Sequence, residues 1–424
     1  MKTQIVFFLI LFLSFGLIAQ EEIELFELYK QARQNHPLKK QSELFQEQNK
    51  LNQSVLKKNF YPQLDLNGQI TYQSDVTEID IPVPGIALPE IKKDQYKMNI
   101  DARQLIYDGG INKSAQKLED IKLLAQITGV EVELYKLYDQ LTNTFFGILL
   151  IDENTKALLE NTRELDKRIE TAEAAVKNGV LTRNNLDKLK AGKLRIEEKQ
   201  IELKYKRRAL FKTLSQLTGK DYHEEIILKL PEETNFVLLG FERPEHKLFE
   251  NQKELYAEQI ELQKKTRHPK VFGFGQAGYG RPGYNMFAEG FDDYYMIGMK
   301  LSWNIYDWNQ SRERRNVLEI EQEIINNRKE AFDLSLNIAI ENYLTGLEKI
   351  NALMLNETKI LKMQGEILKR TSAELDNGTI TTADYLGDLN AHSQAAIRLN
   401  SFQIEKLKTQ IELQILSGGV SGLQ

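Results

Sequence analysis

The sequence predicts a mixed α/β membrane protein, made mostly of long helical coiled-coil hairpins, with four antiparallel strands per chain. Three observations support this prediction: an internal duplication, long proline-free stretches with helical periodicity, and short strands that have one apolar and one polar face. The 424-residue chain contains no cysteine, which excludes disulfides, thiolate metal sites and thiol nucleophiles.

The chain opens with a short apolar segment. Residues 1–19 carry Lys2, an apolar run from Ile5 to Leu13, and Ala19 at the end, which is typical of a secretory signal peptide. No later apolar run approaches the roughly 20 residues of a transmembrane helix. The net charge of −5 does not favour a nucleic-acid partner. No catalytic or paired-histidine motif is present, so we expect no enzymatic activity, cofactor or metal site.

The second half of the chain repeats the first. With a shift of 199 residues (307 − 108 = 199), the halves align without a gap from about residue 94 to 219, and an Asp and two Gly residues match: Asp108 with Asp307, Gly179 with Gly378, and Gly219 with Gly418. We infer a two-fold internal repeat. The predicted organisation is a first repeat at 20–219, a linker at 220–240 and a second repeat at 241–424.

Each repeat contains a long region of helical periodicity. Apolar residues recur mostly at spacings of three, four or seven, and no proline occurs in 108–219 or 307–424. An Asn-Gly pair then supplies a left-handed helix end, and a Thr offers the N-cap of a returning helix. The predicted hairpin tips lie near 178–182, with Thr182, and near 377–381, with Thr381.

Four strands alternate between apolar and polar residues. We predict them at about 62–74, 94–106, 269–281 and 293–306. About ten residues with one apolar face is typical of membrane barrel strands, whose other face lines a wet lumen. On this basis the lipid-facing set is Tyr96, Met98, Ile100, Ile297, Met299 and Leu301, and the lumen set is Lys97, Asp101, Arg103 and Lys300.

Aromatic residues gather where strands meet helices, as in a membrane-interface girdle: Tyr61, Tyr107, Trp303, Tyr306 and Trp308. The connections 74–93 and 281–292 would be external loops. Four strands cannot close a barrel in lipid, because bare sheet edges are not tolerated there and about eight strands are the minimum. The barrel must therefore be shared, with eight strands from two copies or twelve from three.

The order of these features resembles the TolC family of outer membrane efflux proteins. The resemblance rests on five segments: NFYPQLDLNG (59–68), LIYDGG (105–110), NIYDWN (304–309), NGVLT (178–182) and NGTIT (377–381). It implies a homotrimer whose twelve-stranded barrel spans the outer membrane of a Gram-negative bacterium above a periplasmic helical tunnel. Such a channel is the passive exit duct of a tripartite efflux or type I secretion system, together with a periplasmic adaptor (membrane fusion) protein and an inner-membrane transporter.

The resemblance also implies roles for particular residues. The adaptor would dock on the two tips, at Gly179, Val180, Leu181, Gly378, Thr379 and Ile380. Asp384 matches a tunnel-constricting aspartate, although it could equally be a helix-end charge. The family's second aspartate falls on Gly387, and Asp388 follows one place later. The family's gate arginine and its partner fall on Ile380 and Asn185, so that ion pair is not expected here.

Two other classes of protein also contain helical hairpins. A periplasmic adaptor normally has one hairpin inserted in a compact β domain, whereas this chain has two hairpins in a gapless repeat. A soluble coiled-coil scaffold of an envelope complex would leave the two-faced strands and the aromatic residues unexplained.

Overall fold

The structure is a computed structural model that describes residues 22–77, 91–231, 243–288 and 290–419. The predicted signal peptide, most of the loop 74–93 and part of the linker 220–240 lie outside these residues. Within the described ranges, no helix has a stretch that is long and apolar enough to cross a membrane.

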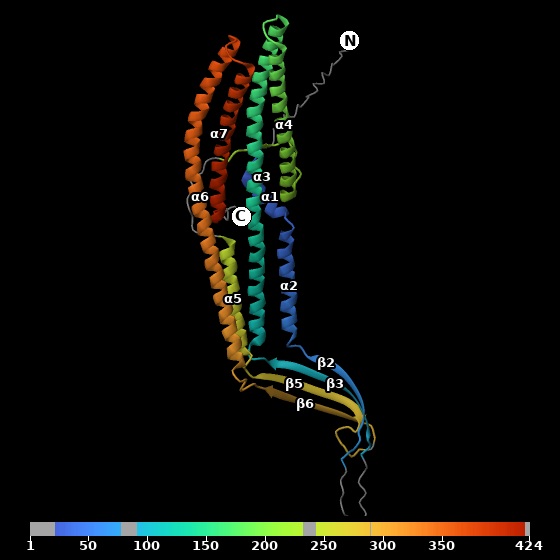
Figure 1. Ribbon diagram of the computed structural model, residues 1–424. Helices are drawn as coiled ribbons and strands as arrows, with labels where there is room; N and C mark the ends of the chain where they lie inside the picture. Colours follow the sequence, from blue (N-terminus) through green and yellow to red (C-terminus); the bar gives the residue numbers. More distant parts are fainter. Residues whose placement is uncertain (1–21, 78–90, 232–242, 289, 420–424) are drawn as a thin grey trace, which may run out of the picture. The chain divides into compact units, whose positions relative to one another are not determined.

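Long helices and antiparallel strands make up most of the described residues, as predicted (Figure 1). Two short strands, at Glu22–Ile23 and Ile227–Leu228, pair in parallel and were not predicted. In chain order the elements are β1 (Glu22–Ile23), α1 (Leu25–Asn35), α2 (Leu38–Lys58), β2 (Gln63–Tyr72), β3 (Asp94–Tyr107), α3 (Ile111–Lys177), α4 (Arg183–Thr218), β4 (Ile227–Leu228), α5 (Pro244–Lys265), β5 (Lys270–Arg281), β6 (Asp292–Ser302), α6 (Gln310–Asp376) and α7 (Thr382–Leu416).

The chain forms two compact units, and each takes residues from both halves of the sequence. The strand unit comprises residues 40–132 and 244–333, and the hairpin unit comprises residues 1–39, 133–243 and 334–424. The four-stranded sheet lies in the strand unit, and both hairpin tips lie in the hairpin unit.

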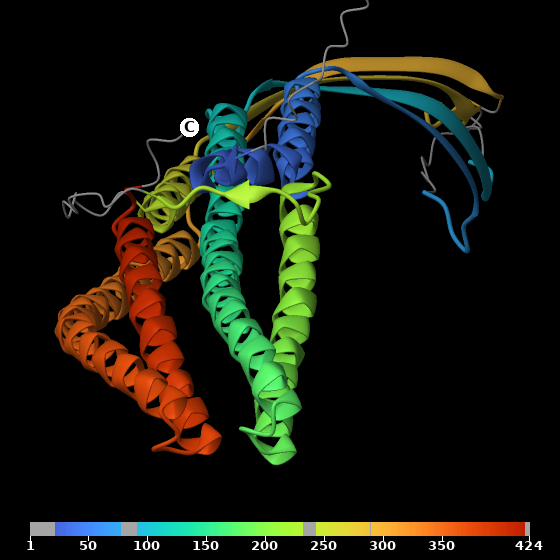
Figure 2. The same cartoon turned by 90° about the horizontal axis from the view of Figure 1, so that it is seen from above.

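The sheet has the strand order β2-β3-β5-β6, and every neighbouring pair is antiparallel. The four strands bend together along their length (Figure 2). β2 and β6 are the two edges. A register shift between Leu105 and Tyr107 interrupts the β3–β5 pairing near the start of α3.

The fourth strand is shorter than predicted, because it ends at Ser302 and not at residue 306. The Trp303 indole donates a hydrogen bond to the carbonyl of Arg267 at 3.0 Å. The Arg267 guanidinium in turn donates to the carbonyl of Ile305 at 3.2 Å. Side-chain hydrogen bonds therefore hold this segment where the backbone ladder has already stopped.

One face of the sheet is apolar and exposed. The register aligns Leu66, Ile100, Ala277 and Tyr295 across the four strands in one row of this face. Large side chains elsewhere on the same face are among the most exposed of the chain, including Ile297 at 84%. A water-soluble sheet would cover such a face, because burial of apolar surface is the main driving force of folding.

The opposite face is polar and internally hydrogen-bonded. The Asp101 carboxylate accepts bonds from the side-chain amides of Asn67 at 2.7 Å, Asn99 at 2.8 Å and Gln276 at 2.7 Å. One row nearer the helices, Arg103 forms an ion pair with Asp65 at 3.1 Å. The predicted division of β3 and β6 into an apolar and a polar set agrees with the observed register.

Glycines in β5 and β6 allow aromatic rings to lie against the backbone. A Cβ at Gly278 would lie 2.5 Å from the ring of Tyr294, which is its cross-strand partner, and 2.8 Å from the Met98 carbonyl oxygen. A Cβ at Gly298 would likewise lie 2.7 Å from the ring of Phe274, which is its cross-strand partner. Gly278 and Gly298 thus make room for aromatic rings within the sheet.

The first strand-to-helix turn is built by Asp108. Its carboxylate accepts the backbone N–H of Gly110 at 2.8 Å and of Asn112 at 2.6 Å, which caps the start of α3. Gly109 has a φ of 71°, and a Cβ there would lie 2.3 Å from the Cβ of His268. Both the backbone conformation and the available space require glycine at this position.

The turn before α6 has the same construction but different residues. Asp307 accepts the backbone N–H of Ser311 at 3.0 Å. The two residues that follow Asp307, Trp308 and Asn309, have φ values of 52° and 64°. They occupy the positions that Gly109 and Gly110 hold in the first turn.

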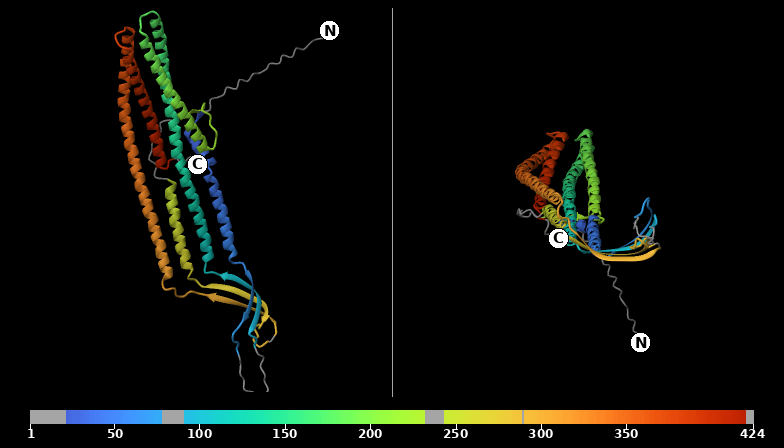
Figure 3. Two further views of the ribbon diagram at one scale, coloured as in Figure 1. Left: turned by 45° about the vertical axis from the view of Figure 1, so that its right-hand side comes forward. Right: turned by 90° about the horizontal axis from the view of Figure 1, so that it is seen from below.

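In the hairpin unit, α4 returns beside α3 and α7 returns beside α6 (Figures 1 and 3). The deepest side chains of α3 here include Leu141, Phe145 and Ile148, none of which is exposed. Tyr29 of α1 bonds to the Thr142 hydroxyl at 2.5 Å, and its ring packs on Tyr138. This contact attaches the N-terminal helix to the middle of α3.

We predict that Gly278→Val destabilises the sheet by about 1–3 kcal/mol, because the new side chain has to displace the Tyr294 ring and meets a backbone oxygen. Gly68→Val is the matched control, since a Cβ at Gly68 meets nothing within 4 Å. Thermal unfolding in detergent would measure both. Equal melting temperatures for the two variants would contradict the ring-packing role of Gly278.

Candidate functional site

The two hairpin tips share one backbone geometry. α3 ends at Lys177 and α6 at Asp376, and each is followed by a glycine with positive φ, 73° at Gly179 and 72° at Gly378. The next residue in each turn donates its amide to a carbonyl five residues earlier: Val180 to Ala175 at 2.8 Å and Thr379 to Glu374 at 3.0 Å. Since a Cβ at either glycine meets no atom within 4 Å, the constraint is the backbone angle alone.

The structure divides the residues expected to dock a partner into two kinds. Val180 is 81% exposed at the first tip, and Thr379 is exposed at the second. Leu181 and Ile380 are half-buried instead, because they pack on the apolar cluster just below the tips. Of the residues expected to dock a partner, the glycine and the residue that follows it are therefore the ones exposed at each tip.

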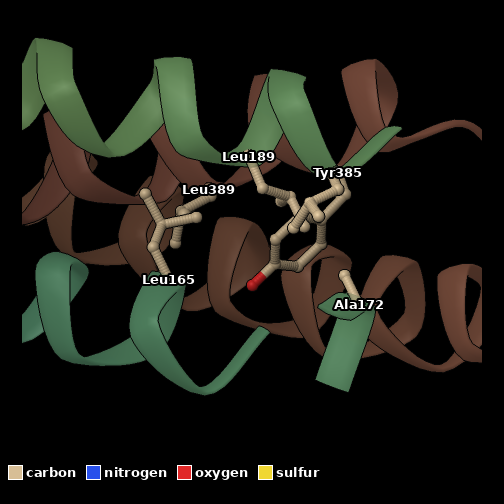
Figure 4. Packing of buried hydrophobic residues seen from close by; sticks show 6 residues of the cluster. Leu165, Ala172, Leu189, Tyr385 and Leu389 are labelled. Carbon is tan, nitrogen blue, oxygen red and sulfur yellow. The ribbon is translucent and has the colours of Figure 1, made fainter. Parts of the chain in front are cut away.

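That cluster, which we call the sub-tip cluster, joins the two hairpins. Figure 4 shows its side chains directed toward one another from three helices: Leu165 and Ala172 of α3, Leu186 and Leu189 of α4, and Tyr385 and Leu389 of α7. The Tyr385 side chain is fully buried, and its hydroxyl lies 3.3 Å from a Glu164 carboxylate oxygen. Burial, together with the nearby Glu164 charge, raises the pKa of Tyr385 to about 12.

A single arginine reaches from the first hairpin to the second beside this cluster. Arg168 of α3 forms an ion pair with Asp376 of α6 at 2.5 Å and also bonds to the Ser372 hydroxyl. Its guanidinium lies 5.2 Å from the centre of the Tyr385 ring, and its side chain is only 17% exposed. We call these contacts the Arg168 clasp.

Sequence reasoning missed the Arg168 clasp. One signal was available, because with the shift of 199 the counterpart of Arg168 is the apolar Ile367. The positions where the family's gate ion pair would lie, Ile380 and Asn185, carry no opposite charges. The ion pair that links the hairpins in the structure is made instead by Arg168 and Asp376.

The two threonines expected to cap the returning helices differ. Thr381 forms a capping box with Asp384, in which the threonine oxygen accepts the Asp384 amide at 3.3 Å and the carboxylate accepts the Thr381 amide at 3.0 Å. Thr182 is the N-cap residue of α4, as predicted, and has the extended backbone of that position, but its side chain makes no capping bond. Asn185 stands in α4 where Asp384 stands in α7, so the acidic half of the box is missing.

The two candidate constriction residues sit in different surroundings. Asp384 is exposed, and the hydrogen bond from the Thr381 hydroxyl is the main reason why its pKa is lowered. Asp388 is half-buried one turn later and accepts a bond from Thr371 of α6 at 2.6 Å. Among the described residues, no group of three or more His, Cys, Asp or Glu side chains could hold a metal ion.

Comparisons with known proteins agree with this geometry. Residues 28–220 match the family model described as outer membrane efflux protein. No curated protein matches the sequence.

Solved structures are similar over nearly the whole chain. The Campylobacter jejuni CmeC outer membrane channel has a TM-score of 0.68 at 15% identity, covering 93% of this chain and 85% of CmeC. VceC of Vibrio cholerae has a TM-score of 0.67 at 14% identity, covering 93% of this chain and 96% of VceC. The open state of the Neisseria gonorrhoeae MtrE outer membrane channel has a TM-score of 0.66 at 16% identity, covering 93% of this chain and 89% of MtrE. At these identities the likeness concerns the fold.

We predict that Arg168→Gln loosens the spacing of the two tips, because the charge pair with Asp376 and the contact with the Tyr385 ring are lost. The chain has no cysteine, so spin labels on Val180→Cys and Thr379→Cys report this spacing directly. The distance distribution should broaden for Arg168→Gln and change less for Arg168→Lys, which keeps the charge. An unchanged distribution for Arg168→Gln would mean that the sub-tip cluster alone fixes the tips.

The long hairpins, the two-faced antiparallel sheet and the match of residues 28–220 to the family model lead to one conclusion: the chain is similar to outer membrane efflux proteins in its first repeat by sequence and over nearly its whole length by fold.

Proposed function

We propose that the protein is one subunit of an outer membrane channel that serves as the passive exit duct of a tripartite efflux or type I secretion system. The observation that carries the proposal is the sheet with a bare apolar face and a hydrogen-bonded polar face. This arrangement suits a barrel wall, with lipid outside and a wet lumen inside. The polar face would then line the path of the exported substrate.

The sheet edges support a barrel shared between copies of the chain. Within the described residues, β2 and β6 each pair on one side only. An unpaired edge is not tolerated in lipid, so each edge needs a strand from a neighbour. β6 runs toward the helices and β2 runs away from them, so β6 of one copy can pair antiparallel with β2 of the next. We propose a homotrimer with twelve strands, as the family resemblance implies.

Exposed apolar residues along α6 also favour assembly. In α3 the matching stripe is largely covered within the chain, whereas in α6 several members are exposed: Val317, Ile320, Ile324 and Leu334. A neighbouring copy would cover them. The internal duplication is supported in turn by α3 and α6, which are both 67 residues long and start 199 residues apart, at 111 and 310.

The tips suit docking of a periplasmic adaptor, with an inner-membrane transporter as the energy source. The protein would then reside in the outer membrane of a Gram-negative bacterium, in contact with lipid, and would carry out no catalysis. An adaptor or a soluble scaffold is not favoured, because the matched family and the similar structures are outer membrane channels.

Cysteine labelling tests the proposed barrel. We predict that a water-soluble thiol reagent reaches Lys97→Cys much faster than Met98→Cys in intact outer membranes, since neighbouring residues of a strand face opposite sides. The matched pair Lys300→Cys and Met299→Cys in β6 should behave in the same way. Faster labelling at 98 than at 97 would reverse the assignment of the faces, and equally fast labelling would argue against a membrane location.

At the tips, we predict that Gly378→Val abolishes export while outer membrane levels and the trimer are retained. A β-branched residue with positive φ costs about 1–2 kcal/mol or more, and the distortion is confined to the docking turn. Gly346→Val in α6 is the control, because this glycine has no positive φ and no atom near its Cβ position. Export by the Gly378→Val variant at the parental rate would remove this tip from adaptor docking.

Asp384 is expected to influence ion selectivity. In a trimer, three such carboxylates around one opening raise the negative potential and favour cations. Asp384→Asn should therefore weaken cation selectivity and block by multivalent cations in bilayer conductance recordings. Because the pKa of Asp384 is lowered, the effect of the native residue should persist at mildly acidic pH and disappear only as the pH falls through that lowered value. Unchanged selectivity would leave Asp384 with its capping role alone.

A further inference from the structure

The loop between β6 and α6, residues 303–309, is apolar and exposed to an unusual degree. It contains both tryptophans of the chain, and its large side chains are all exposed: Trp303, Ile305, Tyr306 and Trp308. The rings of Tyr306 and Trp308 pack edge to face at 4.9 Å. The loop directly continues the apolar face of β6, which ends with the exposed Met299 and Leu301. We call residues 303–309 the aromatic loop.

Trp308 is held in a backbone conformation that a bulky residue rarely adopts. Its φ is 52°, and its side chain is 82% exposed, so packing within the chain does not explain the choice of residue. The turn itself does not require tryptophan, because Gly109 makes the equivalent turn in the first repeat with a φ of 71°. The ring contact of this strained residue is with Tyr306, which is itself exposed, and this combination points to a function outside the chain.

Positive charge accompanies the aromatic loop. Arg312, Arg314 and Arg315 occupy the first two turns of α6, where the helix dipole disfavours cations. Arg267 bonds to the Ile305 carbonyl from the other side of the loop. The carboxylate of Asp307 is already engaged with Ser311, which leaves Glu313 as the nearest other acid in the sequence. Arg312 and Arg314 are exposed and Arg315 is half-buried, so these guanidinium groups are accessible to an anion from outside the chain.

We propose that the aromatic loop and the arginines at the start of α6 form a membrane-interface site for anionic phospholipid headgroups. Trp and Tyr side chains partition into the interface, and arginine pairs with phosphate through parallel hydrogen bonds. The proposal rests on the proposed function, because it requires the apolar face of β6 to lie in a bilayer. It adds that the contact distinguishes lipids by headgroup charge.

Tryptophan fluorescence tests this directly. In the Trp303→Phe variant, Trp308 is the only tryptophan. The full chain would be reconstituted in bilayers with either brominated phosphatidylglycerol or brominated phosphatidylcholine at the same mole fraction, in a background of unlabelled lipid. We expect brominated phosphatidylglycerol to quench Trp308 in preference to brominated phosphatidylcholine. The preference should be roughly fivefold for each arginine that contacts the headgroup.

The charge dependence separates headgroup recognition from simple insertion. R312Q/R314Q/R315Q should remove the preference, whereas K349Q/K359Q/K362Q, which removes the same charge further along α6, should retain it. Equal quenching by the two brominated lipids in the native loop would overturn the headgroup site but leave the membrane location intact. Quenching by neither lipid would count against the membrane location itself, and so against the proposed function.

A second variant tests the role of Trp308. Trp308→Gly restores the residue type of position 109, so we expect a melting temperature in detergent no lower than that of the parent. Added phosphatidylglycerol should raise the melting temperature of the parent more than that of the variant, because a ligand stabilises the state that binds it. A lower melting temperature of the variant in detergent alone would assign Trp308 to packing and overturn the proposal.

Discussion

The pairing of backbone groups at the sheet edges is the constraint on which the rest of this structure depends. In lipid, an unpaired backbone N–H or C=O costs several kcal/mol, so a sheet can span a bilayer only as a closed barrel. Among the described residues, β2 and β6 each pair on one side only, so the proposed membrane location would require assembly of the chain with copies of itself. The bare apolar face and the exposed stripe of α6 are consistent with such assembly, since both would be unfavourable in an isolated chain in water.

The tips depend on a different balance of forces. Each turn needs only a glycine with positive φ, and the position of one turn relative to the other comes from the sub-tip cluster and the Arg168 clasp. Tyr385 provides most of this link, because its ring is fully buried between helices of both hairpins. Exposed ion pairs add little to stability, whereas the largely buried Arg168 guanidinium fixes geometry through several partners at once.

Matched positions in the two halves of the chain carry different side chains. The same left-handed turn is made by Gly109 in one repeat and by the strained, exposed Trp308 in the other. An apolar Ile367 matches the charged Arg168, and a complete capping box in α7 matches an incomplete one in α4. In each pair the backbone conformation or helix position is the same and the side chain differs, so the two halves make different contacts from similar backbones.

The sequence by itself determined the features that depend on local geometry. Alternation in β3 and β6 assigned their faces, because side chains of a strand alternate strictly, and Asn-Gly located the tips, because glycine tolerates positive φ. Only the tertiary structure decided features that depend on distant partners. Arg168 meets Ser372 and Asp376 more than 200 residues later, and Trp303, just beyond the end of β6, bonds to Arg267 of another segment. No local period encodes such contacts, since they form only when separate helices and strands pack together.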